Sequence, residues 1–116
     1  MTYQKADRKK IEDMSARELN SIMKYLSGIY KRAKKRSDLA DYSHAKPSEM
    51  YRYDRQLIYL IDRTLADCSR QNSMILRRTY FENDDSEWYT EFLSPSAFYR
   101  LKKEAAVEFL NCLDYQ

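Results

Sequence analysis

The chain has 116 residues, of which 34% are charged and 43% hydrophobic, with one glycine and two prolines. This composition fits one globular domain and excludes a disordered protein, and the scarcity of glycine and proline predicts long helices. No apolar run approaches the roughly 18 residues of a membrane span, and no signal peptide is visible, so we expect a cytoplasmic protein that does not enter a membrane.

The first long helix is predicted to begin after Ser15, and residues 2 to 13 before it are expected to form a short basic helix or an arm. Ser15-Ala16-Arg17-Glu18 has the spacing of a capping box, in which serine and glutamate satisfy each other's backbone N–H groups. An apolar stripe of helical period then continues to about Ser37. The polar segment from Asp38 to Lys46 is predicted to be a connection.

Positive charge gathers in the first part of the chain. Residues 1 to 46 hold 12 Lys and Arg against 6 Asp and Glu, whereas residues 47 to 116 hold 9 against 12. In one interpretation, the cations near the helix end offset the partial negative charge of its C-terminus. In the other, they form a patch of auxiliary phosphate contacts. That patch consists of Lys31, Arg32, Lys34, Lys35 and Arg36.

A second long helix is predicted to open at Pro47-Ser48-Glu49 and to carry an apolar stripe as far as Cys68. Two long helices joined by a short linker pack as an antiparallel hairpin. We therefore expect residues 1 to 69 to form a helical hairpin. Residues 70 to 116 are expected to add three shorter helices, packed on the hairpin as one compact domain. These helices span about 73 to 82, 86 to 92 and 95 to 114, and the predicted fold class is all-α.

The last predicted helix has the most informative start. Ser94 is a good N-cap, and Pro95 falls at the first helical position, where its missing N–H costs nothing. Ten residues from Ser94 to Lys103 hold three cations and no acid. On a helical wheel, Phe98, Leu101, Ala105, Phe109 and Cys112 share one face. Ser96, Ala97, Tyr99, Arg100 and Lys103 lie opposite that face or beside it.

Two interpretations of this helix remain open. It is either an ordinary amphipathic helix with a solvated basic face or a DNA-reading helix. In the second case, Arg100 and Lys103 meet phosphates or guanine edges, and Ser96, Ala97 and Tyr99 lie at the groove.

The segment from Phe98 to Ala105 resembles the recognition helix of phage late-gene transcriptional regulators of the ArpU and RinA kind, which resemble region four of sigma factors. Ile75-Leu76-Arg77-Arg78-Thr79-Tyr80-Phe81 is similar to the helix that opens their three-helix unit. The resemblance covers about residues 72 to 113 and implies a helix-turn-helix that binds double-stranded DNA. The whole chain also resembles small mollicute proteins, which implies no function.

The chain departs from that family pattern in two places. Phe92 stands where a turn-forming glycine is usual, and the middle helix should be rich in small residues but reads Glu87-Trp88-Tyr89-Thr90-Glu91. Acidic side chains there would repel DNA phosphates. They favour an alternative function from another class, a protein-binding adaptor that keeps the helix-turn-helix shape and acts on a partner such as RNA polymerase.

Catalytic and metal-binding signals are weak. His44 is the one histidine, and no Gly-rich phosphate loop or nucleophile elbow is present. Asp84, Asp85 and Glu87 lack the spacing of a calcium loop and are expected to cap the predicted middle helix. Cys68 and Cys112 lie far apart on apolar faces, and we interpret them as buried thiols rather than a disulfide or metal pair. No enzyme and no cofactor are expected.

The tyrosine content bears on assembly, since the chain has 11 tyrosines and most fall at core spacing on the two long helices. The hairpin therefore offers more apolar surface than two helices cover, which predicts a homodimer through residues 19 to 65. In the competing arrangement, the distal half of the last helix folds back and covers the hairpin within one chain.

Overall fold

A computed structural model describes residues 10–44, 46–82 and 84–115. Most of these residues are helical and none of them lies in a strand, which confirms the all-α class. The elements in chain order are η2 (Ile11–Asp13), α1 (Ala16–Ser43), α2 (Glu49–Asp67), α3 (Arg70–Leu76), the π-helical turn η3 (Arg77–Phe81) and α4 (Pro95–Asp114). Of the segment predicted to be a basic helix or arm, residues 2 to 9 lie outside the described part of the chain.

Each of the four α-helices in the described part of the chain begins at a serine whose hydroxyl accepts a backbone N–H of the first turn. Ser15 forms the predicted capping box with Glu18, and Pro95 follows Ser94 in the first turn of α4. The four serine caps and the residues whose N–H they accept are Ser15 with Glu18, Ser48 with Tyr51, Ser69 with Asn72, and Ser94 with Ala97. Local hydrogen bonding therefore fixes where each helix starts.

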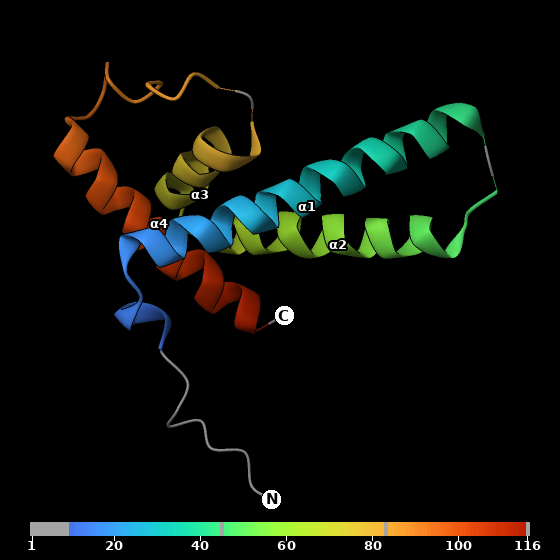
Figure 1. The fold of residues 1–116 in the computed structure, drawn as a ribbon, viewed down its shortest axis with the longest axis horizontal. Coiled ribbons are helices and arrows are strands. Elements are labelled where there is room, and N and C mark those ends of the chain that lie inside the picture. The colour runs from blue at the N-terminus through green and yellow to red at the C-terminus, as the bar shows by residue number, and fades with distance from the viewer. Residues whose placement is uncertain (1–9, 45, 83, 116) are drawn as a thin grey trace, which may run out of the picture.

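The two long helices α1 and α2 form the predicted hairpin (Figure 1). The predicted end of the first helix near Ser37 is wrong, because α1 continues to Ser43 through most of the expected connection. The Tyr51 hydroxyl donates a 2.7 Å hydrogen bond to Asp41, which holds the last turns of α1 against the first turn of α2. His44 then ends α1 in the left-handed conformation with φ of 54°.

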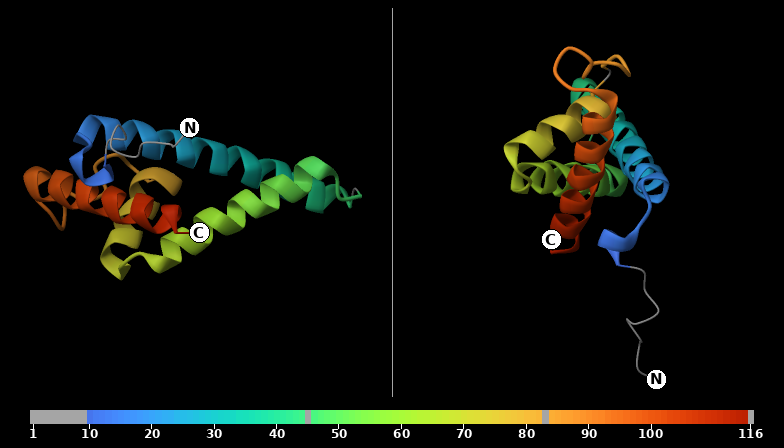
Figure 2. Two further views of the ribbon diagram at one scale, coloured as in Figure 1. Left: turned by 90° about the horizontal axis from the view of Figure 1, so that it is seen from below. Right: turned by 90° about the vertical axis from the view of Figure 1, so that its left-hand side faces the viewer.

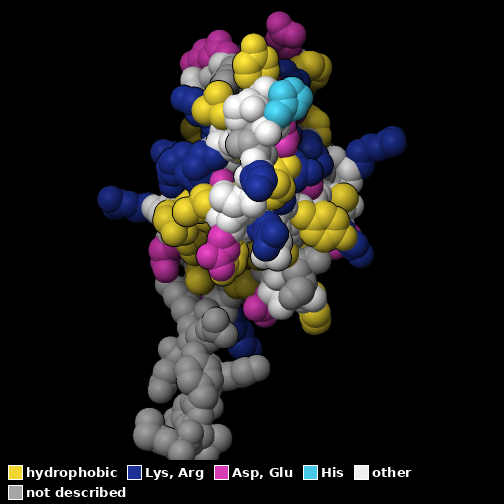
Figure 3. Space-filling model, turned by 90° about the vertical axis from the view of Figure 1, so that its right-hand side faces the viewer, with side chains coloured by type: hydrophobic (Ala, Val, Ile, Leu, Met, Phe, Trp, Pro, Cys, Tyr) yellow, Lys and Arg dark blue, Asp and Glu magenta, His cyan; other side chains and the backbone are white. Residues whose placement is uncertain are grey.

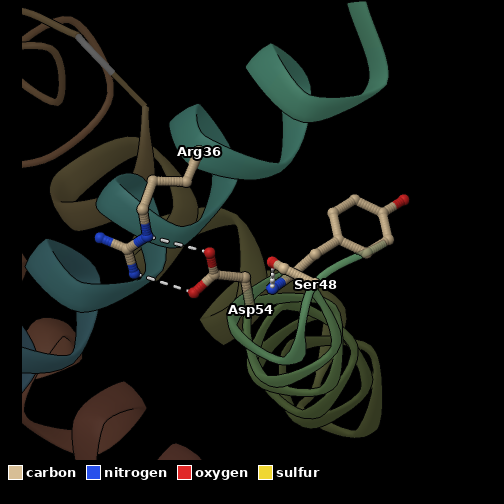
Figure 4. A network of polar contacts seen from close by, with 4 residues as sticks. Arg36, Ser48 and Asp54 are labelled. Atoms are coloured by element: carbon tan, nitrogen blue, oxygen red, sulfur yellow. Dashed lines mark hydrogen bonds and ion pairs between the residues drawn. The ribbon is translucent and has the colours of Figure 1, made fainter. Parts of the chain in front are cut away.

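A charged contact joins the two helices of the hairpin in the half nearer to its connecting loop (Figure 4). The Arg36 guanidinium donates two hydrogen bonds to the Asp54 carboxylate, at 2.9 and 2.8 Å. Asp54 is only 4% exposed, so the bidentate pair compensates the loss of water around its charge. The pair with Arg36 lowers the pKa of Asp54. Farther from the connecting loop, the Tyr30 hydroxyl of α1 donates a 2.8 Å hydrogen bond to Asp62 of α2.

Helix α4 crosses the hairpin at the end opposite its connecting loop (Figures 1 and 2). It contacts both α1 and α2 as well as α3, and its distal half covers part of the hairpin within one chain. One core joins all four helices, and its fully buried members include Leu19, Met23, Ile61, Leu65, Ile75, Leu76, Ala105 and Phe109. The small side chains at Ala105 and Ala106 are buried where α4 meets its neighbours.

The predicted middle helix of the three-helix unit is wrong: residues 86 to 92 form a run of turns. Their backbone bonds are short range, from Trp88 N–H to Asp85, from Thr90 N–H to Glu87 and from Phe92 N–H to Tyr89. The Asp85 carboxylate and the Thr90 hydroxyl also bond to nearby backbone groups, which competes with a helical ladder. The aromatic contacts of Trp88 and Tyr89 hold this segment against α4 and η3.

Helix α3 widens at its end into the π-helical turn η3, in which the Glu82 N–H bonds to the Arg77 carbonyl at 2.7 Å. The wider turn places Tyr80 in the core, where its hydroxyl donates to Asn20 at 2.6 Å. Phe81 packs edge-on against Tyr30 with the ring centroids 5.3 Å apart. Such π-turns occur mostly as single turns and frequently lie at functional sites.

Replacing Asp54 should destabilise the protein in a pH-dependent way. The Asp54→Asn change removes a buried carboxylate that accepts two charge-assisted bonds, and we expect a loss of about 1–3 kcal/mol at neutral pH. Because the folded-state pKa of Asp54 lies below its unfolded value, the stabilisation is present above that unfolded value, about 3.9, and is lost as the pH falls through the folded value. Urea unfolding at several pH values measures this, and equal acid dependence in parent and variant would contradict it.

Replacing Phe98 should also strongly destabilise the protein. Phe98 is buried at 4% exposure, and its removal by Phe98→Ala should cost about 3–5 kcal/mol. Half-buried Leu101 should lose less on truncation. Arg100→Ala, on the exposed side of the same helix, is the matched control and should stay within about 0.5 kcal/mol of the parent. Thermal melts that show equal effects for Phe98→Ala and Arg100→Ala would mean that the buried face of α4 is misassigned.

Candidate functional site

The first turns of α4 present most of the predicted DNA-contacting residues to solvent. Ser96, Arg100 and Lys103 are exposed, and Tyr99 is 58% exposed. Ala97 is half-buried, and its N–H is the group that the Ser94 cap accepts. The serine cap and Pro95 set the start of the helix. The opposite, buried face sets its rotation.

Phe98 anchors that rotation. Its ring stacks on Tyr89 with centroids 3.7 Å apart and planes inclined by 2°, and it meets Trp88 edge-on at 5.8 Å. Trp88 is held in turn, since its indole N–H lies 3.4 Å from the Thr79 hydroxyl and the Arg78 guanidinium sits 4.5 Å above its ring. The turns before α4 therefore clamp the helix from one side and leave the face of Tyr99 and Arg100 open.

Lys102 occupies an unusual place beside this anchor. Its ammonium lies over three aromatic rings, 5.6 Å from the Tyr80 centroid, 5.9 Å from Phe98 and 5.5 Å from Tyr99. Half-burial lowers the pKa of Lys102, and the nearby charge of Lys24 lowers it further. Within the described part of the chain, no carboxylate forms an ion pair with this ammonium.

Helix α1 places further side chains close to Lys102. A small hollow between α1 and α4 is lined by Ala16, Leu19, Asn20, Tyr80, Tyr99, Lys102, Lys103 and Ala106. Lys24 lies one turn beyond Asn20 on α1 and acts electrostatically on Lys102. We call Lys24, Lys102 and Lys103 the lysine corner. The corner holds three positive charges, and no ion pair among the described residues neutralises it.

The sequence interpretation missed Lys24 and Lys102. Lys102 adjoins the apolar stripe on the helical wheel. One signal was present, because Lys102 follows Phe98 by four residues and its stem can therefore lie along that ring. Lys24 could not be found, since only the packing of α1 on α4 brings it to Lys102.

Arg100 forms a 3.6 Å ion pair with Glu104 one turn along α4. The side chains of Arg100 and Glu104 are 65% and 57% exposed. An exposed i,i+4 pair contributes little stability, so Arg100 can exchange Glu104 for another anion at small cost.

The five predicted auxiliary phosphate contacts fall into three surroundings. Arg36 is bound to Asp54, and the Arg32 guanidinium lies beside Gly28. The other three residues, Lys31, Lys34 and Lys35, line an open groove with Tyr30, Asp38, Leu39, Tyr42 and Phe81. We call it the lysine groove. The structure therefore does not gather all five cations at the start of α4.

The acidic residues before α4 are partly used within the chain. Asp84 accepts a 2.6 Å bond from Arg78, and Asp85 accepts the N–H of Glu87. The expected capping of a middle helix is replaced by this capping of a turn. Residues 10–44, 46–82 and 84–115 contain no group of three or more His, Cys, Asp or Glu residues that could hold a metal ion. The same residues include no helix long and apolar enough to span a membrane.

Neither Cys68 nor Cys112 forms a disulfide within the described residues; Cys68 is buried and Cys112 is half-buried. Burial raises the pKa of Cys68 to about 12, and Cys112 contributes to the shift. The expectation that the two cysteines lie far apart is wrong, since they are near enough to interact. A thiol with a pKa this high is almost entirely protonated at neutral pH and is a weak nucleophile.

Protein-family models, curated proteins and solved structures give no match to this chain. The resemblance of residues 72 to 113 to sigma-region-four-like regulators therefore stays a prediction, and the arrangement of side chains in the structure carries the functional argument.

Neutralising Lys102 should not harm the fold. Its pKa is lowered in the folded state, so folding disfavours the charged form, and stability should rise as the pH increases through that folded value. Lys102→Met keeps an apolar stem against Phe98 and Tyr80 without the charge. At neutral pH, we expect the variant to melt at the same temperature as the parent or higher. The rise in stability that the parent shows at alkaline pH should be absent from the variant. A clearly lower melting temperature would mean that the ammonium stabilises the fold.

Proposed function

We propose that the chain is a cytoplasmic regulator of transcription that binds double-stranded DNA through the lysine corner and the exposed face of α4. The observation that carries this proposal is the lysine corner itself. Lys102 and Lys103 line the hollow between α1 and α4, and Lys24 of α1 is near enough for its charge to act on Lys102, so the packing of the two helices keeps like charges close.

Such a corner favours an anion with several charges at regular spacing. Each lysine that meets a phosphate releases a condensed counterion, which makes binding favourable and salt-dependent. Lys102 is well suited to this role because three aromatic rings restrict where its ammonium can lie. A positioned cation spends less conformational entropy on contact than a free surface lysine.

The rest of the exposed face would read or position the duplex. Arg100 can form a bidentate contact with a guanine edge, and Ser96 and Tyr99 lie on the exposed face of the same turns. The resemblance to sigma-region-four-like regulators supports this assignment. The turns at residues 86 to 92 depart from that pattern, and in this chain aromatic contacts with Phe98, rather than a middle helix, pack against the start of α4.

A protein-binding adaptor is the second candidate, and one observation favours it. Glu87 and Glu91 are exposed near Phe92, which is itself 70% exposed. An exposed aromatic side chain is typical of a protein-contact surface, and the acids beside it would repel DNA phosphates. RNA polymerase would be the partner that the resemblance to sigma factors implies.

DNA binding should weaken when the basic side chains of α4 and the lysine corner are removed. Arg100→Ala should cost about 1–3 kcal/mol if it meets a base, with a further loss for Lys103→Ala. Lys24→Gln and Lys102→Met should each lower the slope of log affinity against log salt by about 0.9 per lost phosphate contact. Fluorescence anisotropy with labelled genomic fragments at several salt concentrations measures both effects.

Arg52→Gln is the matched control, because Arg52 is an exposed cation on α2 outside the corner. It should leave affinity and salt slope nearly unchanged. The proposal is wrong if the variant lacking Lys24, Lys102 and Lys103 binds duplex DNA as the parent does, or if Arg52→Gln weakens binding equally. Strong protein contacts without any DNA binding would favour the adaptor.

A further inference from the structure

The lysine groove is a surface that the proposed DNA contact does not use. Lys31, Lys34 and Lys35 are exposed and spaced so that they follow one side of α1, while Tyr30 and Phe81 form a half-buried aromatic floor. Leu39 at 61% exposure and Tyr42 at 86% extend the groove toward the hairpin end. The face at that end shows hydrophobic side chains among Lys and Arg (Figure 3).

The floor of this groove is poorly suited to duplex DNA. The Tyr30 hydroxyl already donates to Asp62, and its ring meets Phe81 edge-on, so neither aromatic offers a free donor to a base edge. A phosphate backbone would satisfy the lysines but leave the apolar floor exposed to water. An acidic polypeptide with an apolar anchor matches both parts, since carboxylates meet the lysines and the anchor covers the floor.

A segment of that chemistry exists in the chain itself. We call residues 84 to 92 the acidic loop. Within it, Glu87, Glu91 and Phe92 border one surface hollow. Phe92 is 70% exposed, and neither glutamate forms an ion pair with another described residue.

The acidic loop is held away from the groove of its own chain. Trp88 and Tyr89 pack on Phe98 of α4, and the loop runs toward the start of α4, away from residues 34 to 42 of α1 (Figure 1). Its carboxylates and Phe92 are therefore presented outward in a fixed position. A prearranged loop loses little conformational entropy when it docks.

We propose that the acidic loop of one copy docks in the lysine groove of a second copy, with Phe92 against the aromatic floor and Glu87 and Glu91 against the lysines. A twofold axis makes this contact twice, because each copy offers both surfaces. The predicted homodimer interface through residues 19 to 65 is thereby limited to the lysine groove. Its partner surface, the acidic loop, lies outside the hairpin. This self-association does not depend on DNA binding.

Charge reversal tests the pairing directly in sedimentation experiments without DNA, from about 1 μM to about 1 mM of the full chain. One variant reverses the groove (Lys34→Glu with Lys35→Glu), and another reverses the loop (Glu87→Lys with Glu91→Lys). Each variant alone sets like charges against each other and should self-associate at least about tenfold more weakly than the parent. An equimolar mixture restores both contacts and should form heterodimers about as well as the parent forms homodimers.

The control variant carries Arg32→Glu with Arg52→Glu, which changes the charge as much as the groove variant but does not line the groove. It should dimerise like the parent. The proposal is overturned if the parent stays monomeric throughout, if the mixture stays monomeric, or if the control loses self-association as fully as the groove variant. If the parent dimerises but does not bind duplex DNA, the result counts against the proposed function and not against this proposal.

Discussion

The burial of Phe98 is the contact on which the arrangement at α4 depends. Stacking on Tyr89 and edge contact with Trp88 fix the rotation of the helix, and the same ring forms part of the surface over which the Lys102 ammonium lies. Once that face is buried, the helical period places Tyr99, Arg100 and Lys103 on the exposed side. A core contact thereby decides which side chains are offered to a partner.

Local signals in the sequence predicted the starts of α1 and α2 and the whole of α4 correctly, whereas α3 begins at Arg70, before its predicted start near Ser73. Ser94 and Pro95 need only their neighbours to start a helix, so the sequence carries that information. The end of α1 was missed because it depends on a hydrogen bond between Tyr51 and Asp41, two residues on different helices. The turns around Trp88 were missed for a similar reason, since aromatic packing on α4 decides their conformation.

The candidate site, too, could be predicted from the sequence only in part. The exposed face of Ser96, Arg100 and Lys103 followed from helical periodicity alone. Lys24 and Lys102 could not be paired from the sequence, because α1 and α4 lie at opposite ends of the chain and meet only in the fold. The run from Lys31 to Arg36 reads as one basic patch in sequence. In three dimensions one arginine binds Asp54 and three lysines line a separate groove.

The most direct test of the lysine corner as a DNA contact is a titration of the isotope-labelled protein with duplex DNA, followed by amide chemical shifts in NMR spectra. The account predicts salt-sensitive shifts at residues 96 to 103 and around Asn20 and Lys24, with smaller changes at Lys34 and Tyr42. Shifts confined to the lysine groove or the acidic loop, or no shifts at moderate salt, would contradict it.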